Sequence, residues 1–182
     1  MRVISGRLKG RVLMGYHIEG TRPTMDRVKE SVFASIQNRL EGSVVLDLFA
    51  GSGNLGIEAI SNGASKCYFV DHNRECIKAI SSNIKNFGIE KECIVIQSDY
   101  HKALENFENR KIQFDIIFID PPYRYQIMNE LLELIVKYQL LKDSGIIVLE
   151  YQNEGIIDSN SYFSLIKTKK YGDKYVSIYR KM

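Results

Sequence analysis

The sequence predicts an α/β protein with a doubly wound, mostly parallel sheet. From residue 44 onward, short and nearly continuous apolar runs alternate with segments whose apolar residues recur at helical spacing. Strands that are apolar on both faces are typical of a parallel sheet covered by helices on both sides. The chain ends differently, because two β-like runs flank Tyr171-Gly172-Asp173. We therefore expect the parallel sheet to be completed by an antiparallel C-terminal hairpin.

The chain begins with an arm and a helix that precede the alternating core. Residues 1–14 predict a small β-hairpin, since two β-like runs surround the turn-prone segment from Gly6 to Gly10. Residues 24–40 predict a helix with one apolar face, and Pro23 just ahead of it fits a helix start. The core strands are expected at 44–49, 66–71, 93–99, 114–120 and 145–151, and the core helices at 54–62, 74–87, 101–109 and 126–140.

The size and composition indicate one globular domain (42–182) with the arm and helix in front of it (1–41). The chain has 182 residues, of which 45% are hydrophobic and 26% charged. No apolar run approaches the roughly 18 residues that span a bilayer, and no apolar segment follows the basic N-terminus as in a signal peptide. The three cysteines are scattered and lack metal-ligand spacing. We expect a cytoplasmic monomer with reduced cysteines, no metal and no membrane partner.

Positive charge is concentrated at the N-terminus, although the net charge of the whole chain is only +3. Residues 1–29 contain two acidic residues, Glu19 and Asp26, against seven basic ones. The basic residues are Arg2, Arg7, Lys9, Arg11, Arg22, Arg27 and Lys29. A local cluster of this kind suits a polyanionic partner such as nucleic acid. A solubilising terminal segment is the alternative.

A glycine loop follows the first core strand and opens a helix. Its sequence from Gly51 to Gly56 is GSGNLG, which satisfies the pattern G-x-G-x-x-G. Asp71 ends the next strand, twenty residues after Gly51. Glycines let the backbone approach a ligand closely, and an acid at this offset can accept hydrogen bonds from ribose hydroxyls. The loop therefore predicts an adenosine-containing ligand, with a tight turn and a structural acid as the alternative.

Two further acids, Asp47 and Asp99, bear on which adenosine-containing ligand binds. Asp47 lies four residues before the first glycine, where its charge would repel the pyrophosphate of NAD but attract the ammonium of a methionine moiety near a sulfonium centre. This charge favours S-adenosylmethionine, although Asp47 alternatively caps or braces the loop. Asp99 ends the third strand and is expected to accept the adenine amino group, with the backbone of Tyr100 nearby. It alternatively caps the helix that follows, and both roles can coexist.

The segment Asp120-Pro121-Pro122-Tyr123 ends the fourth strand, at the same edge of the sheet as the glycine loop. Proline cannot continue a central strand, and the second proline holds the first in an extended conformation. The carboxylate of Asp120 and the carbonyl of Pro121 thus become two fixed acceptors for an exocyclic amine. The ring of Tyr123 offers a stacking face worth about 1–3 kcal/mol. The segment predicts methylation of a nucleobase amine, with a rigid loop and a surface tyrosine as the alternative.

These residues resemble those of class I S-adenosylmethionine-dependent methyltransferases, and more closely those of the bacterial 16S ribosomal RNA guanine-N2 methyltransferases. The resemblance runs over nearly the whole chain. It is carried by RVISGRLKGR near the start, RPTMDRVKESVF (22–33), DLFAGSGNLGIEA (47–59), FVD (69–71) and DPPY (120–123). It implies a Rossmann-like seven-stranded sheet with an antiparallel final strand. It also implies that the target is a guanine in assembling 30S particles.

The resemblance also implies functional residues by motif position. Cofactor contacts are expected at Asp47, Gly51, Gly53, Asp71 and Asp99, with Phe49, His72 and Tyr100 beside them. Base contacts are expected along Asp120, Pro121, Pro122 and Tyr123. The basic arm, together with Arg22 and Arg27, is expected to bind RNA phosphates and position the RNA. One departure is the segment LMGYHIEG (13–20), where many relatives have a proline-containing turn.

Four other functions remain as alternative interpretations of the sequence. N6-adenine methyltransferases also use D-P-P-Y, but usually carry a target-recognition domain for which this chain leaves little room. Protein-glutamine methyltransferases use a related Asn-Pro-Pro-Tyr motif and a separate helical N-terminal domain, whereas this arm is short and basic. An NAD-dependent oxidoreductase is disfavoured by Asp47 and by D-P-P-Y. A non-catalytic RNA-binding module would explain the arm but not the glycine loop.

Overall fold

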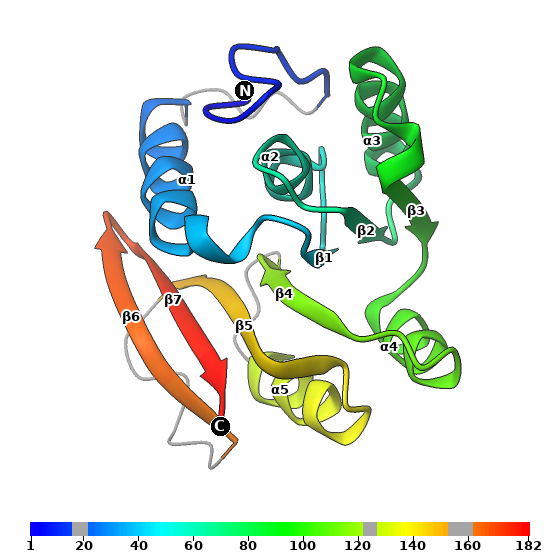
Figure 1. Cartoon of the computed structure of the whole chain (residues 1–182), viewed down its shortest axis with the longest axis vertical. Helices are drawn as coiled ribbons and strands as arrows, with labels where there is room; N and C mark the ends of the chain where they lie inside the picture. The colour runs from blue at the N-terminus through cyan, green and yellow to red at the C-terminus, as the bar shows by residue number, and fades with distance from the viewer. Residues whose placement is uncertain (16–21, 122–126, 153–161) are drawn as a thin grey trace.

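The computed structural model describes residues 1–15, 22–121, 127–152 and 162–182, with the backbone alone for 22–25. Its strands form one seven-stranded sheet in the order β3-β2-β1-β4-β5-β7-β6 (Figure 1). The strands are β1 Val44–Leu48, β2 Lys66–Asp71, β3 Cys93–Gln97, β4 Phe114–Ile119, β5 Leu141–Gln152, β6 Phe163–Tyr171 and β7 Lys174–Lys181. The helices are α1 Arg22–Ile36, α2 Asn54–Ser61, α3 Arg74–Phe87, α4 Tyr100–Asn109 and α5 Ile127–Lys137, with short 3₁₀ turns at Gln37–Arg39 and Glu90–Glu92.

The sheet is parallel from β3 to β5 and antiparallel at its end. β1 pairs with β2 on one side and with β4 on the other, and all pairs among β1 to β5 run parallel. β7 lies antiparallel between β5 and β6. The predicted doubly wound sheet with an antiparallel C-terminal hairpin is therefore confirmed. The strand order reverses between β1 and β4, and in such sheets the crevice outside the carboxyl ends of these strands is the place where ligands bind.

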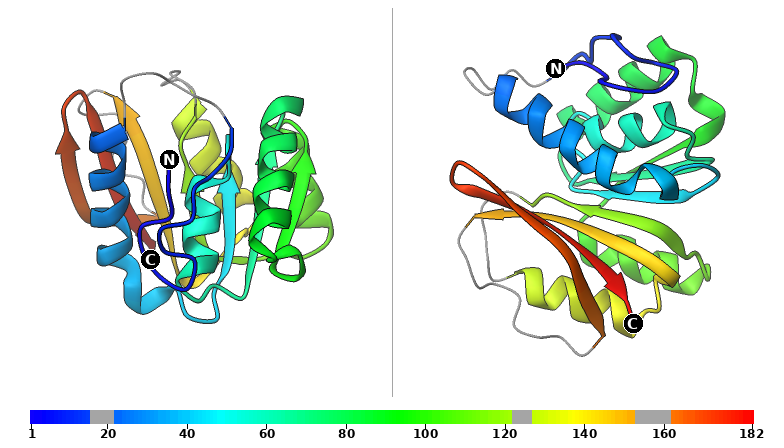
Figure 2. Two further views of the ribbon diagram at one scale, coloured as in Figure 1. Left: turned by 90° about the horizontal axis from the view of Figure 1, so that it is seen from above. Right: turned by 60° about the vertical axis from the view of Figure 1, so that its left-hand side comes forward.

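Helices cover the sheet on both faces, as the apolar strands predict. Helices α1, α2 and α3 lie on one face and α4 and α5 on the other (Figures 1 and 2). Successive strand residues serve the two cores in turn: Phe118 packs in the cluster under α1 and α2, whereas Ile119 packs in the cluster with α4 and α5. The ring of Phe33 in α1 stacks on Phe118 with centroids 5.6 Å apart. This contact fixes α1 over the centre of the sheet.

The N-terminal arm, residues 1–15, folds back on itself as the predicted small hairpin does, but without regular strands. Its two branches meet in a single isolated bridge between Arg2 and Val12, supported by a hydrogen bond from the Val3 amide to the Arg11 carbonyl. Further amides of the arm bond within it, from Gly10 to the Val3 carbonyl and from Leu13 to the Met1 carbonyl, whereas the Arg7 amide bonds to the Ser61 carbonyl of α2. The arm therefore keeps a short stretch of hairpin-like pairing and is held in place by additional hydrogen bonds to the helices.

Several element boundaries also differ from the sequence prediction, among them the starts of α1 and β5. Helix α1 begins at Arg22, so Pro23 lies in its first turn, where a missing amide hydrogen is tolerated. Strand β5 begins at Leu141 rather than at residue 145, because Leu141 pairs with Phe114 before an irregularity shifts the register. Within the described ranges, no helix is long and apolar enough to cross a membrane.

Candidate active site

Four predicted acids lie at one edge of the sheet, at the carboxyl ends of consecutive strands. Asp47 is the fourth residue of β1, Asp71 ends β2, Asp99 follows β3 and Asp120 follows β4. Because these strands are parallel neighbours, their ends meet at the same crevice. Asp47 is close enough to Asp71 and Asp120 for their charges to act on its carboxyl group. The fold thus gathers acids that are far apart in the sequence.

The glycine loop lies between β1 and α2, as its fingerprint predicts. Asp71 accepts a hydrogen bond from the Gly51 amide at 2.9 Å through one oxygen and from the Asn73 amide at 2.8 Å through the other. Gly51 has a φ of +56°, and a side chain there would point into open space. At Gly56, by contrast, an added Cβ would lie 2.3 Å from the ring of Phe69. The third glycine therefore lets α2 pack directly on β2.

Asp47 is buried and braces the loop. Its side chain accepts a hydrogen bond from the Gly56 amide at 2.8 Å, so the bracing role weighed above is present. Burial raises the pKa of Asp47 from 3.8 to about 8, against the Gly56 hydrogen bond, and the charges of Asp120 and Asp71 raise it further. Near neutral pH a carboxyl group in these surroundings is mostly protonated, and an approaching cation favours its ionised form. The site is therefore suited to a positively charged ligand group.

Asp99 and Tyr100 begin helix α4. Asp99 accepts a hydrogen bond from the Lys102 amide at 3.1 Å, which is the predicted capping geometry and the main cause of its lowered pKa. The ring of Tyr100 lies 5.6 Å from that of Phe49. These two rings form an aromatic wall beside the glycine loop. His72 is well exposed, with Nδ1 3.7 Å from the Asp71 carboxylate.

Asp120 is half-buried at the end of β4, with Pro121 beside it. Burial raises the pKa of Asp120 from 3.8 to about 7, the charge of Glu150 adds to the rise and Lys174 opposes it. Such a carboxyl group is poised to exchange a proton near neutral pH. The predicted base contacts at Pro122 and Tyr123 lie outside the described residues.

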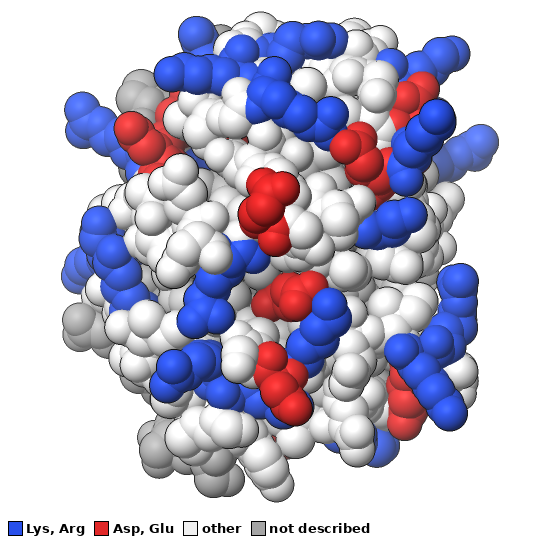
Figure 3. All heavy atoms as spheres, viewed as in Figure 1, with Lys and Arg blue, Asp and Glu red and all other residues white. Residues whose placement is uncertain are grey.

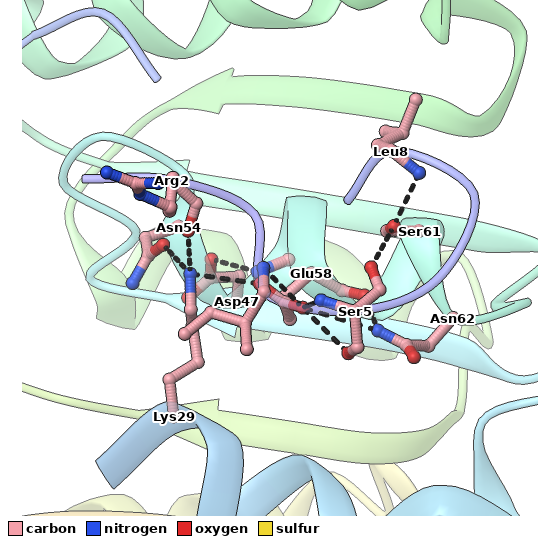
Figure 4. A network of polar contacts seen from close by, with 11 residues as sticks. Arg2, Ser5, Leu8, Lys29, Asp47, Asn54, Glu58, Ser61 and Asn62 are labelled. Carbon is pink, nitrogen blue, oxygen red and sulfur yellow. Dashed lines mark hydrogen bonds and ion pairs between the residues drawn. The ribbon is translucent and has the colours of Figure 1, made fainter. Parts of the chain in front are cut away.

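The most deeply buried ion pair of the site was not predicted from the sequence. Lys29 in α1 and Glu58 in α2 are 2% and 0% exposed, and their charged groups are 2.9 Å apart (Figure 4). Glu58 accepts hydrogen bonds from the amides of Ile4 and Ser5 in the arm. Lys29 donates to the Asn54 side chain at the start of α2. One indication of this pair was present in the sequence, because Glu58 is the single acidic residue in the largely apolar helix NLGIEAIS.

A second link joins the arm to the glycine loop through Asn83 of α3. The side chain of Asn83 is fully buried. Its oxygen accepts from the Met14 amide at 2.7 Å, and its nitrogen donates to the carbonyls of Met14 and Ser52 at 2.8 and 3.2 Å. Ser52 belongs to the glycine loop. The arm is thus linked to the glycine loop through Asn83 and to the helix after it through Glu58.

The basic side chains of the arm lie on the surface. Arg2, Arg7, Lys9 and Arg11 are exposed, as is Arg27 in α1, whereas the side chain of Arg22 lies outside the described residues. Figure 3 shows Lys and Arg side chains gathered along its upper edge, where the arm lies. Two of these residues also make contacts within the protein. Arg7 pairs with Glu92, and Arg11 donates to the Asn86 carbonyl and lies over the ring of Phe87.

Comparison with known proteins gives one family and several close relatives. The family model described as "Conserved hypothetical protein 95" matches residues 1–180. The chain is 44% identical to a Bacillus subtilis protein named "Putative rRNA methyltransferase YlbH", over 100% of this chain and 99% of the relative. It is 31% identical to the "Ribosomal RNA small subunit methyltransferase D" of Haemophilus influenzae, over 94% and 89%.

The solved structures include a similar protein of Escherichia coli, described as "Putative methyltransferase yhhF". Its structure superposes with a TM-score of 0.87 and 30% identity, covering 100% of this chain and 97% of that one. The likeness spans the arm as well as the sheet. The fold is therefore that of the class I methyltransferases.

Proposed function

The chain belongs to the "Conserved hypothetical protein 95" family, and from that premise we propose that it methylates the exocyclic N2 amine of a guanine in 16S ribosomal RNA, with S-adenosylmethionine as the methyl donor. The observation that carries the proposal is the meeting of Asp47, Asp71 and Asp120 at the crevice between β1 and β4. The names of the H. influenzae and B. subtilis relatives support ribosomal RNA as the substrate.

The residues of the crevice fit S-adenosylmethionine better than NAD. The buried carboxyl of Asp47 is surrounded by further acids, which suits the ammonium and sulfonium charges and disfavours a pyrophosphate. Asp71 keeps lone pairs for the ribose hydroxyls while it holds Gly51 and Asn73. Phe49 and Tyr100 provide apolar surface for the adenine, and Asp99 at the cap of α4 is placed to accept from its amino group.

The acceptor side of the reaction rests on Asp120 and Pro121. When bound, S-adenosylmethionine supplies an electrophilic methyl group on a sulfonium centre. A nucleobase amine is a weak nucleophile because its lone pair is conjugated into the ring. The Asp120 carboxylate and the Pro121 carbonyl accept its two N–H bonds and stabilise the positive charge that develops on nitrogen. Asp120 then takes the proton that the methylated nitrogen loses.

The RNA is held by the basic arm and helix α1. The exposed residues Arg2, Lys9 and Arg27 are placed to bind phosphates, which positions the RNA without reading its sequence. In this division of labour, residues 1–41 position the RNA and residues 42–182 bind the cofactor. The target guanine must be unpaired or flipped to enter the crevice. We propose assembling 30S subunits as the substrate and a cytoplasmic monomer as the enzyme.

The test is transfer of a tritiated methyl group to ribosomal RNA and to 30S assembly intermediates, followed by nucleoside analysis. We expect radioactivity in N2-methylguanosine. Radioactivity in N6-methyladenosine would show that the target base is adenine, which the D-P-P-Y segment also accommodates. An absence of transfer, with calorimetric binding of NAD and none of S-adenosylhomocysteine, would overturn the proposal. The variant Asp120→Ala serves as the control that separates catalysis from cofactor binding.

A further inference from the structure

Three charged side chains lie in a row on adjacent strands, at the edge of the sheet where β4 ends. The register aligns Ile119 of β4 with Leu149 of β5, so Asp120 lies beside Glu150. On the other side of β5, Gln152 is paired with Lys174 at the start of β7. The row therefore runs Asp120, Glu150, Lys174 in the strand order β4-β5-β7.

All three side chains belong to the same face of the sheet. Phe118, Val148 and Val176 pack in the cluster under α1. Asp120 and Glu150 follow the first two of these by two residues, and Lys174 precedes the third by two. Because strand side chains alternate between faces, the three charged groups share the face that carries α1.

Glu150 and Lys174 form an ion pair that remains accessible. Their side chains are 21% and 36% exposed, so the pair is accessible to solvent rather than enclosed in the core. Glu150 and Lys174 shift the pKa of Asp120 in opposite directions, so both lie within electrostatic range of it. A partly buried ion pair contributes little net stability after desolvation, so a purely structural role explains it poorly.

The row matches the hydrogen-bonding edge of guanine. Along its Watson–Crick edge guanine presents the N2 amine as a donor, N1–H as a donor and O6 as an acceptor. We propose that Glu150 accepts from N1–H and Lys174 donates to O6, while Asp120 and Pro121 hold the N2 amine. This assignment rests on the proposed function and makes Glu150 and Lys174 the residues that select guanine.

The same row disfavours adenine. With the adenine N6 amine held by Asp120, the neighbouring N1 is an acceptor and would face the Glu150 carboxylate. The next ring position carries a C–H group and would leave Lys174 without a partner on the base. Loss of a hydrogen bond to a charged group, or its replacement by two facing acceptors, should lower the rate of methyl transfer to adenine by roughly 10- to 100-fold. The pair therefore supplies the discrimination that the D-P-P-Y segment alone does not.

The test uses 2-aminopurine, which keeps the exocyclic N2 amine but has an acceptor at N1 and no O6. Once the methylated guanine is mapped, ribosomal RNA is prepared with 2-aminopurine at that position. The wild-type protein should prefer guanine by roughly 10- to 100-fold in kcat/KM. Glu150→Gln should reduce this preference toward unity, because its amide can donate to N1 of 2-aminopurine. The exposed Glu133 on α5 provides the matched control, Glu133→Gln, which should keep the wild-type preference.

Lys174→Met gives an independent measurement. It should lower the rate on guanine more than the rate on 2-aminopurine, since only guanine offers O6. Binding of S-adenosylhomocysteine and the thermal unfolding midpoint report whether each variant is folded. If Glu150→Gln does not fold, the Lys174→Met comparison decides alone. Two outcomes would overturn this inference: an unchanged preference for guanine in folded Glu150→Gln, or equal rate reductions on both bases in Lys174→Met. Methylation of guanine by the wild-type protein would still support the proposed function in either case. Wild-type transfer to adenine would instead remove the proposed function.

Discussion

Lys29 Nζ lies 2.9 Å from the Glu58 carboxylate, and both side chains are almost completely buried between the arm, α1 and α2. The pair does more than neutralise two charges. Glu58 holds the amides of Ile4 and Ser5, and Lys29 holds the Arg2 carbonyl at 2.6 Å and Asn54 at 2.7 Å. One buried pair therefore contacts both the arm and Asn54, the first residue of α2.

Lys29→Met should destabilise the protein strongly. The substitution leaves the Glu58 charge buried without its cation, and breaking a buried pair in this way costs about 3–5 kcal/mol. Urea unfolding measures the decrease in the free energy of unfolding. The exposed Lys85 on α3 provides a matched control, since Lys85→Met should change the free energy of unfolding by less than about 0.5 kcal/mol. A decrease of less than about 1 kcal/mol for Lys29→Met would show that the pair does not bear on stability.

Binding of S-adenosylhomocysteine should release a proton from Asp47. The pKa of this group is raised to about 8 in the free protein, so its carboxyl is protonated at pH 6 to 7. The ammonium of the ligand favours the carboxylate and lowers that pKa, so a proton leaves on binding and none leaves well above pH 8. Calorimetry in buffers of different ionisation enthalpy counts the protons. Asp47→Asn should abolish the release, and its persistence in that variant would assign the proton to another group.

Asp120 should set the pH dependence of methyl transfer. Its pKa is raised to about 7 and the carboxylate is the active form, so kcat/KM should fall tenfold per pH unit below about pH 7 and level off above it. Asp120→Asn retains an acceptor and should flatten this profile. Asp120→Ala should lower kcat by roughly 10²- to 10⁴-fold while S-adenosylhomocysteine still binds. A wild-type rate in Asp120→Ala would eliminate the catalytic role.

Neutralising Arg7, Lys9 and Arg11 together should weaken RNA binding and reduce its salt dependence. Each phosphate that the protein no longer neutralises lowers the slope of log K against log salt by about 0.7 to 0.9. Because Arg7 and Arg11 also bond to Glu92 and Asn86, we expect a total decrease of roughly 1 to 2. Filter binding at several salt concentrations gives the slope. A control removes three exposed cations on the opposite side of the sheet, Arg110, Lys111 and Lys137, and should leave the slope unchanged. If the wild type, the arm variant and the control variant all had the same slope of log K against log salt, the RNA would bind at a surface other than the arm.

The layout of the fold was predictable because each signal is local. The apolar strands, the GSGNLG loop and the acid at Asp71 are short patterns, and each occurs where it was expected. For Asp47 and Asp99 the sequence left two roles open. The bracing and capping hydrogen bonds are present at both, while ligand contacts remain predictions.

The remaining features depend on contacts between distant segments. The row formed by Glu150 and Lys174 beside Asp120 exists only because β7 inserts between β5 and β6, an order that no local pattern specifies. The arm was predicted as a small hairpin, and its sequence gives no indication that Glu58 and Asn83 bond to its backbone. The only hints in the sequence were polar residues, Glu58 and Asn83, on apolar helix faces.

The apolar residues of the arm have a consequence for protein engineering. Val3, Leu8 and Leu13 are buried in the same cluster as Phe118. An arm of this kind cannot simply be transferred to another protein. The recipient would need counterparts of Glu58 and Asn83 to bond to the arm's backbone, and an apolar cavity for the three aliphatic side chains. Engineering of the proposed RNA contacts should therefore use substitutions on the outer surface of the arm rather than exchange of the whole segment.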